Sequence, residues 1–81
     1  MKIPRDVTAE YLIQVSKKLG YQVTRQKGSH VRLTVVINSE EHHLTIPNHS
    51  PIKIGTLNNI LKDISLRFNL SKSELVDKMF N

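Results

Sequence analysis

The chain has 81 residues, a formal net charge of +5 and no cysteine. This length predicts a single domain over residues 1–81, with a thin hydrophobic core. The absence of cysteine excludes a disulfide framework and a cysteine-based zinc site. No apolar run reaches the ~18 residues of a membrane span, and no apolar signal region follows the N-terminus. We therefore expect a cytoplasmic protein with no membrane partner.

The positive charge is distributed unevenly along the chain. Residues 1–62 carry nine Lys or Arg and four Asp or Glu, whereas residues 63–81 carry three of each. A basic surface of this kind favours a polyanionic partner, with nucleic acid first. A solvated basic surface without a partner would give the same count, so charge alone does not separate the two.

The first predicted element is a helix over residues 9–19. Thr8 is a suitable N-cap residue, and Glu10 lies in the first turn, where a negative charge is favourable. Leu12, Val15 and Leu19 repeat at helical spacing. Gly20 follows as the residue that ends the helix.

Three strands are predicted next, over residues 21–25, 29–37 and 42–46. Gly28 supplies the positive φ that a tight hairpin needs, and residues 38–41 form a second turn. Alternation directs one set of side chains to the core: Val31, Leu33, Val35, Ile37, Leu44 and Ile46. It directs the other set outward: His30, Arg32, Thr34, Val36, His43 and Thr45. By the same alternation Arg25 points inward, unless the hairpin turns it out.

Two further helices complete the predicted fold. The first carries apolar residues at helical spacing, namely Leu57, Ile60, Leu61, Ile64 and Phe68, and no good N-cap precedes Ile54. Asn69 can adopt the left-handed conformation that ends it. Ser71 and Glu74 form a capping box for a C-terminal helix over about 71–80. The fold class is therefore α+β, an α-β-β-β-α core over about 6–69 resembling double-stranded-RNA-binding domains, with an extra C-terminal helix.

Several short motifs occur in a fixed order along this framework. They are Leu19-Gly20-Tyr21, the run from Arg25 to His30, Ile46-Pro47 with His49, and Gly55-Thr56-Leu57 with Ile60-Leu61. This ordered set resembles the HicA (YcfA-like) family, mRNA interferase toxins of type II toxin–antitoxin pairs. The resemblance implies an endoribonuclease that cleaves mRNA, with a strand histidine, here His30, as its catalytic residue. It also implies a HicB-like antitoxin as partner.

The residues around His30 suit this chemistry. RNA can be cut by its own 2′-hydroxyl, and an imidazole, which titrates near pH ~6.5, can take up or supply the protons involved. We assign RNA or phosphate binding to Lys27, Gly28, Ser29, Arg32, Arg25 and His49. The alternatives are an exposed hairpin histidine at position 30 and a loop-stabilising one at position 49.

We predict neither a metal site nor a cofactor. His42 and His43 are adjacent in a strand, so their rings point to opposite faces, and no His-x-x-x-His spacing or carboxylate cluster is present. A metal-independent nuclease acting on mRNA is the leading hypothesis. A non-catalytic RNA-binding module of the same fold is the alternative, and a regulatory domain that binds an acidic protein is a third.

Overall fold

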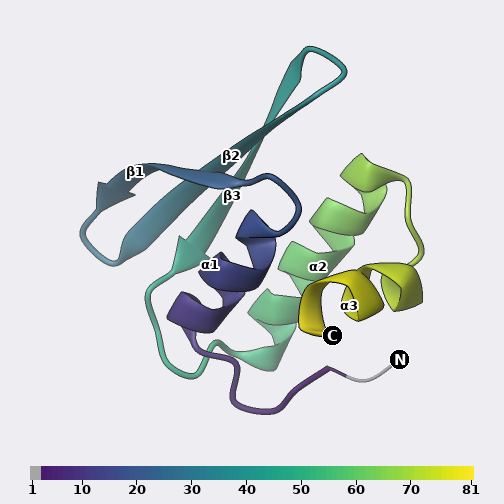
Figure 1. Cartoon of the computed structure of the whole chain (residues 1–81). Coiled ribbons are helices and arrows are strands. Elements are labelled where there is room, and N and C mark those ends of the chain that lie inside the picture. Colours follow the sequence, from purple (N-terminus) through teal and green to yellow (C-terminus); the bar gives the residue numbers. More distant parts are fainter. Residues whose placement is uncertain (1–2) are drawn as a thin grey trace.

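The computed structural model describes residues 3–81. Its elements are α1 (Ala9–Lys17), β1 (Gln22–Lys27), β2 (His30–Ile37), β3 (Glu40–Pro47), α2 (Ile54–Phe68) and α3 (Lys72–Phe80). The strands form one antiparallel sheet in the order β1-β2-β3. Helices α1 and α2 pack on one face of this sheet, and α3 packs against both helices (Figure 1). The predicted α+β arrangement with an extra C-terminal helix is therefore confirmed.

The hydrophobic core lies between the inner face of the sheet and the helices. The sheet contributes Val31, Leu33, Val35, Leu44 and Ile46, as the alternation predicted, whereas Ile37 is only partly buried. The helices contribute Leu12, Val15, Leu57, Ile60, Leu61, Ile64, Leu75, Val76 and Met79. Each buried aliphatic side chain stabilises the fold by about 1.5–3 kcal/mol relative to exposure. The opposite, outer face of the sheet has no helix packed on it (Figure 1).

Helix α1 begins as predicted but ends two residues early. The Thr8 hydroxyl accepts a hydrogen bond from the Tyr11 backbone N–H at 3.0 Å, which caps the first turn. At the other end the chain tightens, because the Leu19 and Gly20 N–H groups bond to carbonyls three residues back. Gly20 then takes a φ of +100°. The prediction of helix through Leu19 is therefore wrong by one short turn.

The ends of α2 and α3 follow the predicted local signals. Lys53 precedes α2 without a side-chain capping bond, and Asn69 ends the helix in the left-handed conformation. The capping box of α3 is formed by Ser71 and Glu74, each bonding to the backbone N–H of the other. These bonds hold the pKa of the Glu74 carboxyl below its usual value, and the bond from the Ser71 backbone N–H has the largest effect.

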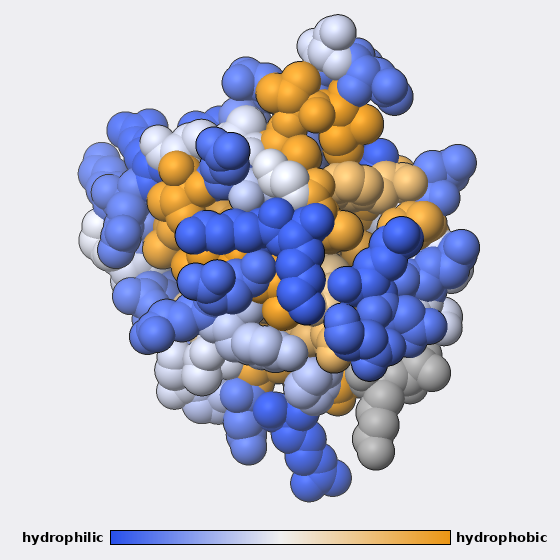
Figure 2. Space-filling model, viewed as in Figure 1, coloured by the Kyte–Doolittle hydropathy of each residue, from blue (hydrophilic) through white to orange (hydrophobic). Residues whose placement is uncertain are grey.

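The hairpin between β2 and β3 turns more tightly than predicted. Only Asn38 and Ser39 form the turn, and both have positive φ, of 52° and 66°. This is the type I′ geometry whose twist matches that of paired strands. Glu40 and Glu41, predicted as turn residues, instead pair with β2. The β2–β3 hairpin projects beyond the helices (Figure 1). Hydrophobic surface lies near its tip (Figure 2). Val36, close to this turn, is 63% exposed.

Strand β1 contains an irregularity that reverses the predicted orientation of Arg25. Val23 pairs with Leu33 and Arg25 pairs with Arg32, so Thr24 has no partner of its own in β2. One extra residue in a strand forms a β-bulge and shifts the following side chains to the other face. Arg25 therefore shares the outer face with Arg32, and its predicted inward orientation is wrong.

Within residues 3–81, no helix is long and apolar enough to span a bilayer.

Candidate active site

Pairing across the sheet brings the predicted site residues into two neighbouring rows. Lys27 lies opposite His30, and Arg25 lies opposite Arg32, which in turn lies opposite Thr45. Directly paired residues present their side chains on the same face of an antiparallel sheet. All five side chains therefore meet on the outer face, at the end of the sheet where β2 begins.

These five side chains line a surface cavity of about 250 Å³. Its lining residues are Arg25, Lys27, His30, Arg32 and Thr45. His30 is exposed, whereas Arg32 is partly buried between its neighbours. The cavity thus combines one imidazole, three cations and one hydroxyl, with no carboxylate in its lining. That combination attracts an anion and offers it one group able to exchange a proton.

The three cations of the cavity form no ion pair among residues 3–81. In that part of the chain, the contacts within 4.0 Å between a basic side chain and a carboxylate are His42 with Asp63 and His43 with Glu41, and neither involves a cavity cation. Three positive side chains held together without acidic partners create a local positive potential. A phosphate group would satisfy these cations where the protein does not.

The remaining predicted binding residues lie outside the cavity lining. Gly28 and Ser29 form the turn that joins Lys27 to His30, and Gly28 has the predicted positive φ of 57°. The Ser29 carbonyl accepts a hydrogen bond from the Asn48 N–H at 2.6 Å, which ties this turn to the loop after β3. His49 in that loop is exposed and is not among the residues that line the cavity.

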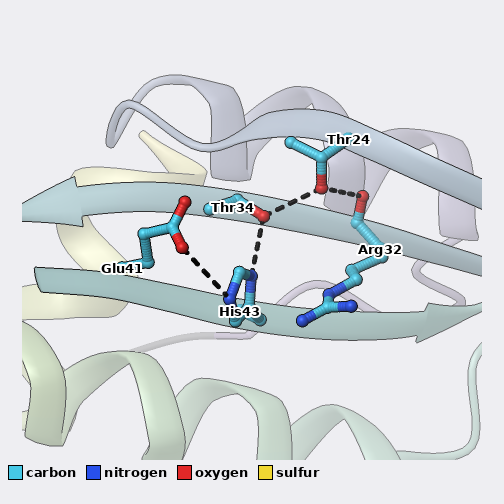
Figure 3. A network of polar contacts seen from close by, with 5 residues as sticks. All are labelled: Thr24, Arg32, Thr34, Glu41 and His43. Atoms are coloured by element: carbon cyan, nitrogen blue, oxygen red, sulfur yellow. Dashed lines mark hydrogen bonds and ion pairs between the residues drawn. The ribbon is translucent and has the colours of Figure 1, made fainter.

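A chain of hydrogen bonds continues along the outer face from this cavity (Figure 3). The Thr34 hydroxyl lies 2.8 Å from both the Thr24 hydroxyl and His43 Nδ1. The Thr24 hydroxyl also donates to the Arg32 carbonyl at 3.4 Å, and His43 Nε2 lies 4.0 Å from a carboxylate oxygen of Glu41. Thr34 was predicted to face outward and does so, yet it is only 9% exposed, because these neighbours cover it.

His42, the neighbour of His43, lies on the opposite face in a buried hydrogen-bonded cluster. Its Nδ1 lies 2.7 Å from the Tyr21 hydroxyl and its Nε2 lies 3.3 Å from a carboxylate oxygen of Asp63. Burial, followed by the nearby Asp63 charge, raises the pKa of Tyr21 well above its usual value. Tyr21 therefore stays protonated, and its hydroxyl donates a hydrogen bond to His42 Nδ1 when Nε2–H of that ring faces Asp63. In the part of the chain described, no three His, Asp or Glu side chains gather as metal ligands.

A larger cavity of about 400 Å³ lies elsewhere, between the segment before α1 and the start of α2. Its lining is mainly apolar and includes Arg5, Asp6 and Lys53, but no histidine. Opposite charges partly offset one another there, and no group suited to proton transfer near neutral pH is present. The smaller cavity around His30 is therefore the better candidate for a reaction at phosphate.

Thr45 is a cavity residue to which the sequence assigned no role. Alternation in β3 correctly placed it on the outer face, but its position beside Arg32 depends on how β2 and β3 pair. That register follows from the two-residue turn at Asn38 and Ser39, which the predicted four-residue turn obscured. The sequence signal that could have indicated this two-residue turn is the Asn in a short polar segment between two strands.

The model of the family described as the HicA toxin of bacterial toxin–antitoxin systems matches residues 9–66. This range includes every residue of the cavity and more than two thirds of the chain, whereas α3 lies beyond it. No curated protein and no solved structure matches the chain. On the family match, the chain belongs to the HicA toxins of toxin–antitoxin systems.

Proposed function

We propose that this toxin is a metal-independent endoribonuclease that cleaves mRNA, with His30 as its catalytic residue. The observation that carries the proposal is the cavity itself, in which one exposed imidazole lies among three cations that form no ion pair within residues 3–81. Such a site suits a reaction at an RNA phosphate. The family match supplies the biological setting, a toxin paired with an antitoxin.

The reaction that fits these residues is transesterification within the RNA. The ribose 2′-oxygen attacks the adjacent phosphorus and forms a P–O2′ bond, while the P–O5′ bond breaks. The 2′-hydroxyl loses its proton and the leaving 5′-oxygen gains one, giving a 2′,3′-cyclic phosphate and a 5′-hydroxyl. His30 accepts the first proton or supplies the second, a contribution of typically about 10²–10⁴ in rate.

The cations of the cavity would bind the phosphate and stabilise its charge during the reaction. Arg25, Lys27 and Arg32 surround His30 and would hold the non-bridging oxygens of the reacting phosphate. As the phosphorus centre becomes five-coordinate, negative charge increases on these oxygens. Fixed positive groups stabilise that charge more in the transition state than in the bound substrate, and this difference accelerates the reaction.

The position of His30 supports its proposed role. It is the first residue of β2 and is paired on both sides, with Lys27 in β1 and Pro47 in β3. The turn before it is held by the bond between Asn48 and Ser29. A catalytic group on a paired strand needs little reordering when the substrate binds.

We propose a HicB-like antitoxin as the protein partner, bound over this outer face. The exposed cations would meet an acidic surface, which accelerates association. Val36, exposed on the same face, would add apolar contact area. Covering His30 would be the simplest way to inhibit the enzyme.

A non-catalytic RNA-binding module remains the second candidate. The observation in its favour is that the cavity lining holds one imidazole only, whereas cleavage needs both a base and an acid. Phosphate binding by the three cations requires neither.

The deciding experiment is incubation of the purified protein with single-stranded RNA, with and without EDTA. We expect cleavage in both, with 2′,3′-cyclic phosphate and 5′-hydroxyl ends, and none with the His30→Ala protein. Activity that disappears with EDTA and returns with a divalent ion would contradict the metal-independent mechanism. Binding without cleavage by the unmodified protein would favour the non-catalytic module.

A further inference from the structure

The hydrogen-bonded row that contains His43 lies directly beside the cavity. Thr34 pairs with His43, and the next row along the same two strands is Arg32 with Thr45. Two residues along a strand cover about 7 Å, so the two rows are close neighbours on one face. The Arg32 side chain and the His43 ring both lie over β3 on that face (Figure 3).

The hydrogen bonds of this row can all be formed together when Nδ1 of His43 carries the proton. Each threonine hydroxyl has a single proton to donate. Thr24 donates its proton to the Arg32 carbonyl, which can only accept. In that arrangement Thr34 donates to Thr24. With that proton used, Nδ1–H of the neutral ring is the donor in the bond between Thr34 and His43.

This tautomer leaves Nε2 of the neutral ring as an unused acceptor. It lies 4.0 Å from the Glu41 carboxylate, beyond hydrogen-bonding distance, and has no other hydrogen-bond partner among residues 3–81. The His43 side chain is 37% exposed. The ring is thus oriented from one side by Thr34 and open to solvent on the other, as expected of a group that contacts a ligand.

We propose that His43 determines specificity, with Nε2 accepting a hydrogen bond from a nucleotide further along the strand than the one at His30. The inference rests on the proposed function, since it assumes that RNA lies along the outer face. The donor is either the ribose 2′-hydroxyl or an N–H group of the base, because both present a proton to such an acceptor. Thr24 and Thr34 act as positioning residues, through the ring orientation they impose.

Distance separates this role from acid–base catalysis at the same phosphate. His30 is paired with Pro47, and His43 lies four residues earlier in β3. Four residues correspond to about 14 Å along the strand. Two imidazoles acting on one phosphate would need to lie much closer than this. The geometry therefore places His43 at a different nucleotide, further along the RNA strand.

The test measures binding in a His30→Ala background, so that no RNA is cut. The probes are a short single-stranded RNA, a series with one 2′-deoxy nucleotide at successive positions, and a series with one abasic nucleotide. His43→Asn is compared with His43→Gln. The Asn amide nitrogen can replace Nδ1 and keep the bond to Thr34, but it offers no acceptor at the Nε2 position. The Gln side chain places an amide near Nε2.

We expect one modified position, in one of the two series, to weaken binding by the His43 protein about threefold to tenfold, the usual effect of one hydrogen bond. His43→Asn should bind the unmodified RNA more weakly by the same factor and lose sensitivity at that position alone. His43→Gln should retain part of the sensitivity at that position. Which series responds identifies the 2′-hydroxyl or the base as the donor.

Equal sensitivity of all three proteins at every position would overturn the inference, and so would a His43→Asn effect accompanied by an equal fall in thermal stability. Cleavage by the unmodified protein is scored separately. Cleavage without position-specific coupling contradicts the role of His43 alone. Coupling without cleavage contradicts the nuclease and leaves His43 as a nucleotide contact.

Discussion

The inner and outer faces of the sheet hold adjacent histidines of one strand in opposite environments. His42 is 6% exposed, and both of its ring nitrogens have partners, Tyr21 and Asp63. His43 is 37% exposed, and only Nδ1 has a hydrogen-bond partner. A ring with both nitrogens satisfied contributes to stability, whereas a ring with an open nitrogen is available to a ligand. His42 and His43 are the same residue type, and the face of the sheet on which each lies determines whether it is satisfied within the fold or open to a ligand.

The same contrast applies to each face as a whole. Inner side chains are apolar or hydrogen-bonded to one another, so replacing them should lower the free energy of unfolding. In the described part of the chain, outer side chains around His30 have no partners of opposite charge, so replacing them should change binding and reaction instead. The predictions below test this separation of stability from activity.

The largest expected effect is on the outer face, at His30. The His30→Ala substitution should reduce RNA cleavage by about 10²–10⁴, because the proposed proton transfer loses its group. Its melting temperature should stay that of the unmodified protein, because His30 is exposed and its removal opens no core cavity. Cleavage assays and thermal unfolding on the same preparations measure both quantities.

Two results at His30 would contradict this assignment. A His30→Ala protein that melts normally and still cuts RNA would show that the residue is not catalytic. One that fails to fold would show that the residue is structural and that the two faces are not separable at this position.

The next largest effect is expected on the inner face, at His42. The His42→Ala substitution should lower the free energy of unfolding by about 2–5 kcal/mol, since it opens a cavity and leaves the buried Tyr21 hydroxyl without its partner. Urea unfolding measures this loss. The matched control is His43→Ala, which should cost less than about 1 kcal/mol. Equal losses for the two variants would mean that the faces do not differ as described.

Removal of single cations should have a smaller effect, confined to RNA binding. For Arg32→Ala or Lys27→Ala, the slope of log affinity against log salt should flatten by roughly 0.7–1 unit, because one fewer phosphate is neutralised. Lys72→Ala and Lys78→Ala in α3 are the controls and should leave the slope unchanged. A larger effect from the α3 substitutions would locate the RNA on the other side of the molecule.

The smallest effect concerns alkaline pH and the inner face. Burial raises the pKa of Tyr21 in the folded protein above the usual value of 10.0. Above pH 10 the unfolded chain therefore loses this proton while the folded chain keeps it, so stability should fall as pH rises. Urea unfolding between pH 8 and about 11 should show a steeper fall for the unmodified protein than for Tyr21→Phe. Tyr11→Phe, at an exposed position, should behave like the unmodified protein.

Local sequence signals predicted most of the fold and the position of His30 at the start of β2. Alternation from Val31 to Val35 identified the buried face, and Gly28 located the turn that places His30 at the start of β2. The orientation of Arg25 was not predictable in this way, since the bulge at Thr24 depends on pairing with β2. The contact of Thr24 and His43 with Thr34 likewise depends on the register of three strands, which alternation within one strand does not define.

The bulge in β1 has a consequence for self-assembly as well. β1 is an edge strand, and all six of its residues are exposed, so its free backbone groups offer a template for a strand of another molecule. A bulge and the positive side chains of Arg25 and Lys27 both discourage such edge-to-edge pairing. The residues proposed to bind RNA thus also discourage pairing between copies of the protein. A toxin whose edge charges were removed would be expected to oligomerise or aggregate through this strand.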